Sequence, residues 1–227
     1  MPDYYPLMLD IRDRLGIVVG GDAIAAEKAR VLSSCGARVR VLGLEFCVEL
    51  QVLAERGQVT LCQKVYESGD LAEAFVVVAV TTDPQVIQTL WQETYQRGQL
   101  LNIVDVPKYC SFILPSVLRR GQLTIAVSTE GASPSLSKRI RQQLEDIFPP
   151  VYGEYIELAA LARSYLRQHG VSYLRRDAFF QDFMASSVLA NMGTGEVEQA
   201  LTVTADLLRM YGVEVPLQEL IDEFRKD

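Results

Sequence analysis

Two stretches of this 227-residue sequence combine residue types and spacing that could support chemistry. The first is the glycine turn at residues 18–25 (VVGGDAIA), which follows an apolar run and opens a helical pattern. At such a turn, free backbone amides and the positive end of the helix dipole attract a diphosphate, and glycines let the ligand approach the backbone. The second is the segment at residues 108–141, whose excess of basic residues could bind an anionic ligand.

The glycine turn departs from the dinucleotide-binding pattern G-x-G-x-x-G/A at its middle position. Gly20 and Ala25 match the first and last positions, whereas Asp22 replaces the middle glycine. Because that glycine leaves room for the diphosphate, Asp22 adds bulk and a like charge. Its carboxylate can instead cap the helix and occupy amides that the ligand would use. The acidic residue expected at the ribose is also displaced, to Glu45. The turn is therefore interpreted as either a phosphate-binding turn or a purely structural one.

Alternating strand and helix patterns surround these residues in the first half of the chain. Apolar runs predict strands at 15–19, 38–42, 59–63, 74–80 and 101–104, and helical spacing predicts helices at 23–34, 46–56 and 84–97. Strands this apolar, joined by helices, are typical of a parallel sheet that helices cover on both faces. We therefore expect a Rossmann-type α/β domain over residues 1–112.

The pattern changes after Pro107. Residues 111–118 and 123–128 indicate strands, and a helix is expected at 135–148, with Ser133 as its N-cap and Pro134 at its first position. Further helices are predicted at 152–169, 177–191, 194–211 and 216–226. We interpret residues 113–150 as a small α+β segment and residues 151–227 as a helical C-terminal region.

The composition argues against several classes of function. With 49% hydrophobic and 22% charged residues, the sequence predicts an ordinary globular protein. No apolar run reaches the ~18–20 residues that a membrane helix needs. Since the N-terminal region also lacks a basic stretch, we expect a cytoplasmic protein. The net charge of −7 argues against nucleic acid or an anionic membrane surface as the main partner.

The charge is distributed unevenly along the chain. Residues 108–141 contain six basic residues against Glu130 alone, and the parts on either side are acidic. This basic segment indicates either a site for an anionic ligand or ordinary solvated charges. Its basic residues are Lys108, Arg119, Arg120, Lys138, Arg139 and Arg141.

No metal site is expected from the cysteines and the histidine. Cys35, Cys47, Cys62 and Cys110 are 12, 15 and 48 residues apart, so no short zinc-binding spacing occurs, and His169 is the single histidine. The cysteines are interpreted as reduced, buried thiols.

Several of these stretches together resemble the precorrin-2 dehydrogenase/sirohydrochlorin ferrochelatase family, the N-terminal module of siroheme synthases. The most specific similarity lies in NIVDVPK at 102–108, SFILPS at 111–116 and AVSTEGASP at 126–134. The stretch PLMLDIR at 6–12, the glycine turn and the stretch AVTTD at 79–83 add to it. The resemblance extends in detail over about residues 4–150.

The resemblance implies an NAD-dependent enzyme of siroheme biosynthesis that oxidises precorrin-2 to sirohydrochlorin. Some members of the family also insert ferrous iron. Members usually form homodimers through the middle segment. The resemblance implies that Asp105 is the essential catalytic aspartate, the alternative being a loop-capping side chain. By matching positions, the residues implied at NAD are Gly20, Gly21, Asp22, Ala23, Ile24, Leu44, Glu45 and Thr81.

The resemblance also implies residues near the tetrapyrrole. Precorrin-2 and sirohydrochlorin carry eight carboxylates, so the basic segment would supply counter-charges, with Arg175 and Arg176 adding to it. Thr129 replaces a regulatory serine of the family, the alternative being a turn hydroxyl. The substrate-binding candidates are Asn102, Lys108, Arg119, Arg120, Ser128 and Thr129.

Asp22 keeps two alternatives to a dehydrogenase open. One is a chelatase that binds the tetrapyrrole but has lost NAD, and the other is a non-catalytic tetrapyrrole-binding homologue.

Overall fold

The computed structural model describes residues 4–226. The chain forms two compact units, one ending at Leu114 and the other beginning at Pro115. The division into three parts at 112/113 and 150/151 stays a prediction. Within residues 4–226, no helix is both long and apolar enough to cross a membrane.

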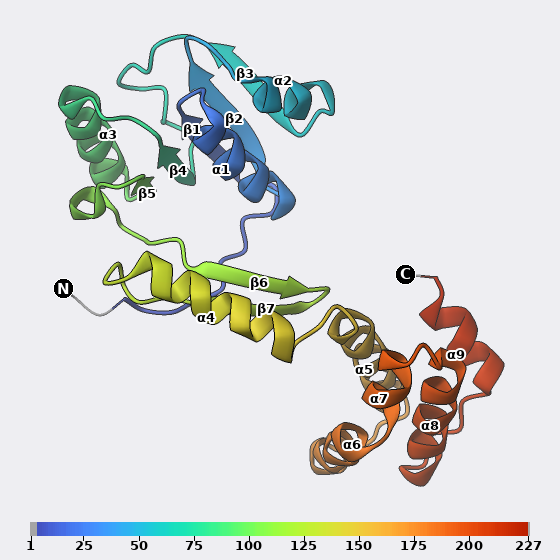
Figure 1. Cartoon of the computed structure of the whole chain (residues 1–227). Helices are drawn as coiled ribbons and strands as arrows, with labels where there is room; N and C mark the ends of the chain where they lie inside the picture. Colours follow the sequence, from blue (N-terminus) through green and yellow to red (C-terminus); the bar gives the residue numbers. More distant parts are fainter. Residues whose placement is uncertain (1–3, 227) are drawn as a thin grey trace. The chain divides into compact units, whose positions relative to one another are not determined.

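The first unit is a five-stranded parallel sheet of order β3-β2-β1-β4-β5 with helices on both faces, which confirms the predicted Rossmann-type α/β fold (Figure 1). Its elements are β1 (Leu15–Val19), α1 (Ala23–Ser34), β2 (Arg38–Gly43), α2 (Val48–Glu55), β3 (Val59–Gln63), β4 (Val76–Ala79), α3 (Pro84–Arg97), β5 (Leu100–Ile103) and the short 3-10 helix η1 (Pro107–Tyr109).

Both faces of this sheet are buried because successive side chains of its apolar strands point to opposite sides. On one face, Val18 and Val78 pack with α1 and α2. On the other face, Ile17 and Val77 pack with α3 and with the loop between β3 and β4. The strand order reverses between β1 and β4, and open α/β sheets bind ligands beyond the carboxyl ends of the strands at such a point.

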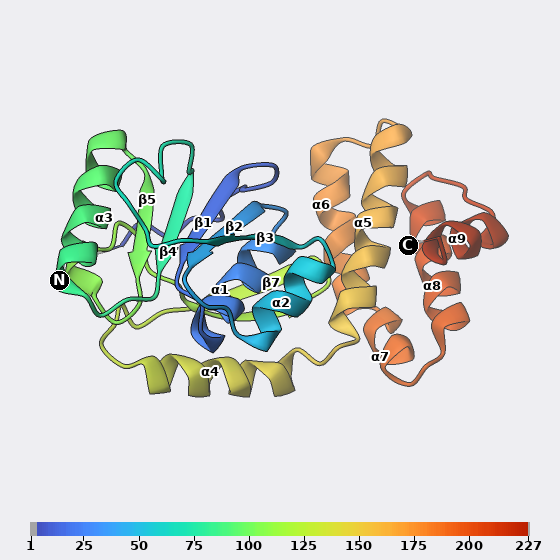
Figure 2. The same ribbon diagram turned by 90° about the horizontal axis from the view of Figure 1, so that it is seen from above.

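The second unit combines a hairpin with a group of helices. Strands β6 (Ser116–Arg120) and β7 (Leu123–Val127) pair antiparallel, and α4 (Pro134–Ile147) packs along them (Figure 1). The helices α5 to α9 lie in one group (Figure 2). They share one core that runs from Leu158 to Ile221. Their bounds are α5 (Tyr152–Gln168), α6 (Tyr173–Ala185), α7 (Val188–Gly193), α8 (Val197–Met210) and α9 (Leu217–Phe224).

The continuous helix predicted at 177–191 is wrong. Helix α6 ends at Ala185, and α7 begins at Val188. The Ser186 hydroxyl donates to the Phe183 carbonyl at 2.7 Å and accepts from the Val188 amide at 3.3 Å. A serine side chain that bonds the local backbone in this way competes with helix continuation.

The strand predicted at 111–118 begins only at Ser116. The preceding residues instead lie along the outer edge of β5, where the Ser111 amide donates to the Leu101 carbonyl at 2.8 Å. The predicted cap of α4 is confirmed, because the Ser133 hydroxyl accepts from the Leu136 amide and Pro134 occupies the first turn.

Candidate functional site

A pocket of ≈720 Å³ lies at the carboxyl edge of the sheet in the first unit. The ends of β1, β2 and β4, the glycine turn and the loop that follows β3 form its walls. This is the place where the strand order reverses, so the pocket has the location expected of a nucleotide site. Its lining residues are Val19, Gly20, Gly21, Asp22, Leu42, Gly43, Leu44, Glu45, Phe46, Cys47, Lys64, Val65, Tyr66, Val80, Thr81 and Val86.

Close backbone packing explains both glycines of the turn. Gly20 has a φ of +138°, a conformation that residues other than glycine rarely adopt. A Cβ on Gly21 would lie 1.7 Å from the Glu45 carbonyl oxygen. The Cys47 amide donates to the Gly21 carbonyl at 2.8 Å, which bonds the β2–α2 loop directly to the turn. The glycine turn and this loop therefore form one wall together.

Asp22 caps helix α1, as one interpretation of the sequence predicted. Its Oδ1 accepts from the Ala25 amide at 2.8 Å. Ala23 and Ile24 are exposed residues, and their amides have no acceptor among the described residues. Asp22 therefore uses one donor of the helix N-terminus and leaves two for a ligand.

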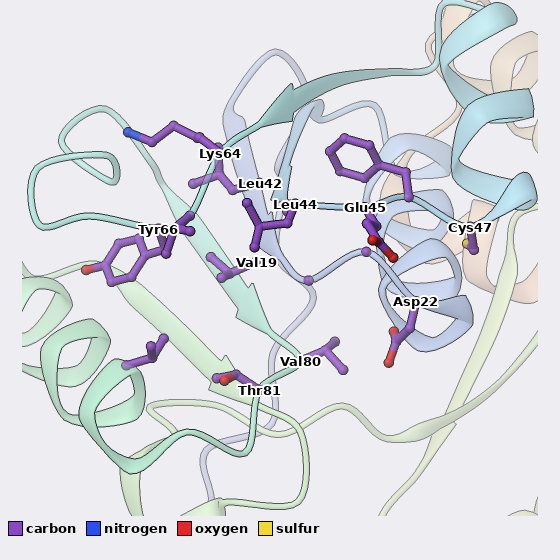
Figure 3. A pocket seen from close by; sticks show the side chains of 16 residues that line it. Val19, Asp22, Leu42, Leu44, Glu45, Cys47, Lys64, Tyr66, Val80 and Thr81 are labelled. Atoms are coloured by element: carbon purple, nitrogen blue, oxygen red, sulfur yellow. The ribbon is translucent and has the colours of Figure 1, made fainter.

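The acidic side chains of the pocket lie at one end of it. Figure 3 shows the carboxylates of Asp22 and Glu45 beside the glycine turn, with Lys64 at the other end. The Lys64 ammonium lies 3.0 Å from the Glu67 carboxylate and 2.9 Å from that of Asp70, and these bonds raise the pKa of Lys64. The positive charge of Lys64 is thus balanced by two carboxylates of its own loop. It does not offset the acidic side chains at the end of the pocket beside the turn.

The wall formed by the β3–β4 loop is the part of the pocket that the sequence interpretation missed. Tyr66 donates its hydroxyl to the Glu93 carboxylate at 2.7 Å, and the Gly69 amide donates to the same oxygen at 3.0 Å. Burial and the bond to Glu93 raise the pKa of Tyr66 well above its ordinary range. Glu93 is 6% exposed and lies on the buried face of α3 with Leu90. The signal in the sequence is that Glu93, an acidic residue, occupies a position of α3 where the helical spacing predicts an apolar one.

Six of the eight residues predicted at NAD line the pocket, and Ala23 and Ile24 do not. Ile24 is 43% exposed on α1. The Thr81 hydroxyl accepts from the Asp83 amide at 3.2 Å and lies at the end of β4. The assignment of these residues to cofactor binding stays a prediction.

Asp105 follows β5 at the same carboxyl edge of the sheet as the pocket. It lies in a turn in which the Val106 amide donates to the Ile103 carbonyl at 3.1 Å, and its φ is +61°. Such a φ is uncommon for a residue other than glycine. No hydrogen bond or ion pair of the described residues engages its exposed carboxylate, so nothing supports the loop-capping alternative.

Two predicted substrate residues flank Asp105 in the first unit. The Asn102 amide group donates to the Phe112 carbonyl at 3.0 Å, so this side chain holds the chain that follows the turn. The Lys108 ammonium lies 5.4 Å from the centre of the Tyr109 ring and is exposed. Lys108 is therefore available to an anionic ligand beside Asp105.

The other predicted substrate residues belong to the second unit, and three of them bond within it. The Thr129 hydroxyl donates to the Ser133 carbonyl and accepts from the Ser133 amide, both at 3.0 Å. The Ser128 hydroxyl accepts from the Glu130 amide at 3.0 Å. The Arg120 Nε donates to the Phe148 carbonyl at 2.9 Å. These bonds agree with the turn-hydroxyl alternative for Thr129 and give Arg120 a structural contact.

The cysteines are free thiols, as predicted, but all four are half-buried rather than buried. Cys110 lies next to the Asp105 turn, and burial raises the pKa of its thiol. The part of the chain that the structure describes contains no group of three or more histidine, cysteine, aspartate or glutamate residues that could hold a metal ion.

Comparison with known proteins gives consistent matches for both units. A family model described as putative NAD(P)-binding matches residues 7–116, and a model described as sirohaem biosynthesis protein central matches residues 120–147. The siroheme synthase of Nitrosococcus oceani is 32% identical over 197 residues, which are 87% of this chain and 42% of that protein. The siroheme synthase of Zymomonas mobilis is 32% identical over 206 residues, 91% of this chain and 44% of that protein. The chain thus spans less than half the length of these relatives.

The fold matches a solved structure over its whole length. The structure titled "SirC, precorrin-2 dehydrogenase" aligns with a TM-score of 0.73 and 24% identity, covering 99% of this chain and 100% of that one. This likeness supports the fold.

Proposed function

We propose that this chain is a member of the precorrin-2 dehydrogenase/sirohydrochlorin ferrochelatase family and that it oxidises precorrin-2 to sirohydrochlorin with NAD. One observation carries the proposal: the carboxylate of Asp105, unpaired within the described part of the chain, follows β5 at the sheet edge that also bears the glycine turn and its pocket. A proton acceptor and a nucleotide-sized pocket at one edge are the parts that such an oxidation needs.

The residues of the pocket fit NAD. The glycines let a diphosphate approach the turn, and the free amides of Ala23 and Ile24 can donate to it. The Glu45 carboxylate, at the end of β2, can accept hydrogen bonds from ribose hydroxyls. Asp22 weakens this fit without abolishing it, since it caps through the Ala25 amide alone. This geometry counts against the alternative in which Asp22 blocks the dinucleotide entirely.

In the proposed reaction, NAD supplies the hydride acceptor when it is bound. The chain's own residues bind and orient the substrate and accept the proton. Asp105 accepts the proton that precorrin-2 loses, because its carboxylate is exposed and forms no hydrogen bond or ion pair with residues 4–226. Lys108 contributes a point charge to one of the substrate carboxylates. The residues of the second unit implied at the tetrapyrrole, and a cytoplasmic location, remain parts of this proposal.

Anaerobic turnover of precorrin-2 by the purified chain tests the proposal. We expect NADH absorbance and sirohydrochlorin absorbance to rise together, and neither to rise without NAD. Titration with NAD and with sirohydrochlorin separates the alternatives. A chain that binds sirohydrochlorin but not NAD would be a chelatase-type homologue. A chain that does not turn over precorrin-2 and binds neither NAD nor sirohydrochlorin would contradict the proposal.

Asp22→Gly is expected to tighten NAD binding about tenfold, or ~1.4 kcal/mol. The change removes a negative charge beside the diphosphate and frees the Ala25 amide. It costs the helix only about a few tenths of a kcal/mol, because glycine is an acceptable N-cap. Isothermal titration of both proteins with NAD measures the difference.

Asp22→Asn is the matched control for this change, because it keeps a capping oxygen and removes the charge. If repulsion dominates, it should reproduce most of the gain, and the gain should shrink as salt is added. Equal NAD affinity in wild type, Asp22→Gly and Asp22→Asn would show that Asp22 does not face the diphosphate.

We also propose that two copies of the chain pair through the hairpin and α4. A two-stranded sheet is marginally stable alone. Here β6 has one buried residue, Leu118, and α4 has one, Ser137, so the hairpin and α4 bury little of each other. Leu136 is 48% exposed and Ile147 60% exposed on α4. Exposed apolar side chains on these elements favour a second copy of the chain that would bury them.

Light scattering after gel filtration tests this pairing. We expect a particle of twice the 25.3 kDa chain mass, and a shift toward the monomer in Leu136→Asp. Met184→Asp, at a 67% exposed position of α6, is the control and should keep the dimer. A wild-type monomer at all concentrations would contradict the pairing.

A further inference from the structure

We infer that Cys110 is a positioning residue that holds the Asp105 turn in its conformation through its thiol. The inference deepens the proposed function and rests on it, because it concerns the carboxylate that would accept the proton.

The thiol bonds to both ends of the turn. The Ile103 amide donates to the Cys110 sulfur at 3.1 Å. The sulfur in turn lies 3.3 Å from the Ile103 carbonyl and 3.4 Å from the Val106 carbonyl, either of which can accept its proton. Ile103 and Val106 are the first and last residues of the turn that carries Asp105. Cys110 therefore fixes the separation of these two residues from outside the turn.

The turn needs such support. A positive φ at Asp105 is unfavourable relative to ordinary backbone and persists where the surroundings hold it. The Val106 amide closes the turn from within, and η1 returns the chain so that Cys110 reaches the end of β5. Because burial raises the pKa of the Cys110 thiol, it stays protonated and remains a donor at neutral pH.

The neighbouring residues anchor the cysteine itself. The Ser111 hydroxyl accepts from the Leu101 amide at 2.8 Å, and the Asn102 side chain donates to the Phe112 carbonyl at 3.0 Å. We call residues 110–112 the edge latch, since they bond along the outer side of β5. Because Ser111 and Phe112 keep their own bonds to β5, a change at Cys110 acts on the Asp105 turn rather than on the whole segment.

The first arm of the test needs no activity. Hydrogen exchange at the Val106 amide reports closure of the turn, and we expect Cys110→Ala to raise its rate at least tenfold. Cys110→Ser should restore most of the protection, because a hydroxyl can also accept and donate. Cys62→Ala, at a half-buried cysteine on β3, is the control and should leave the Val106 rate unchanged. An unchanged rate in Cys110→Ala would overturn the inference.

The second arm measures the consequence for turnover. We expect Cys110→Ala to lower kcat about tenfold with an unchanged KM for NAD, and to have no further effect when Asp105 is already asparagine. A purely structural role would instead lower stability and activity in both backgrounds, and that result would overturn the inference. A wild-type chain that fails to oxidise precorrin-2 would refute the proposed function, while the exchange arm would still decide the role of Cys110.

Discussion

Asp105→Asn is expected to lower kcat for precorrin-2 oxidation by about 10²–10³-fold, the usual effect of removing a general base. Asparagine is nearly isosteric with aspartate and tolerates a positive φ, so the turn with its φ of +61° should persist. The amide cannot take up the proton that the substrate loses. Stopped-flow or steady-state absorbance of sirohydrochlorin measures the change, and NAD affinity should stay within twofold of wild type.

Two further variants separate chemistry from backbone strain at this position. Asp105→Gly removes the carboxylate but relieves the positive φ, so we expect an inactive protein that is at least as stable as wild type. Asp105→Ala should be equally inactive and lose roughly 1 kcal/mol of stability. Wild-type activity in Asp105→Asn would show that another group accepts the proton.

Gly21→Ala should destabilise the first unit by about 3 kcal/mol and abolish NAD binding. Its Cβ would lie 1.7 Å from the Glu45 carbonyl oxygen, which is backbone and cannot rotate aside. The β2–α2 loop would have to move, which breaks the bond from the Cys47 amide to the Gly21 carbonyl. Overpacking of this kind costs roughly 1–3 kcal/mol, and the lost hydrogen bond adds to it. Chemical denaturation and NAD titration measure both effects.

Gly193→Ala is the matched control, because a Cβ placed there meets no described atom within 4 Å beyond its chain neighbours and its own helix backbone. That variant should be as stable as wild type or slightly more so, since alanine favours the helix. A Gly21→Ala protein with wild-type stability and affinity would mean that the loop does not pack on the turn as described.

The fold could be predicted from the sequence because its signals are local. Apolar strands and capped helices of the first unit lie within one or two residues of their predicted ends, as for α3, where Asp83 caps the helix and Pro84 begins it. The break between α6 and α7 could not be predicted, because the apolar spacing continues across it. The break comes from one serine hydroxyl that bonds the backbone. Hydrophobic periodicity carries no information about such a bond.

The site could be predicted only where one motif supplies it. The glycine turn and Glu45 follow their strands directly, and both line the pocket. Tyr66 and Glu93 are 27 residues apart in the sequence, and their bond depends on α3 packing beside the β3–β4 loop. The role of Asp22 was left open by the sequence, because one carboxylate can cap a helix in several ways. Its single bond to the Ala25 amide decides how many donors remain.

The edge latch has a second consequence, for association between molecules. The outermost strand of a sheet can template pairing with another chain and so begin aggregation. On β5, the outward groups of Leu101 and Ile103 are already bonded to Ser111 and Cys110. A side-chain sulfur and hydroxyl thus end the sheet where a sixth strand would otherwise be accepted. The residues that hold the Asp105 turn also keep this edge from recruiting a foreign strand.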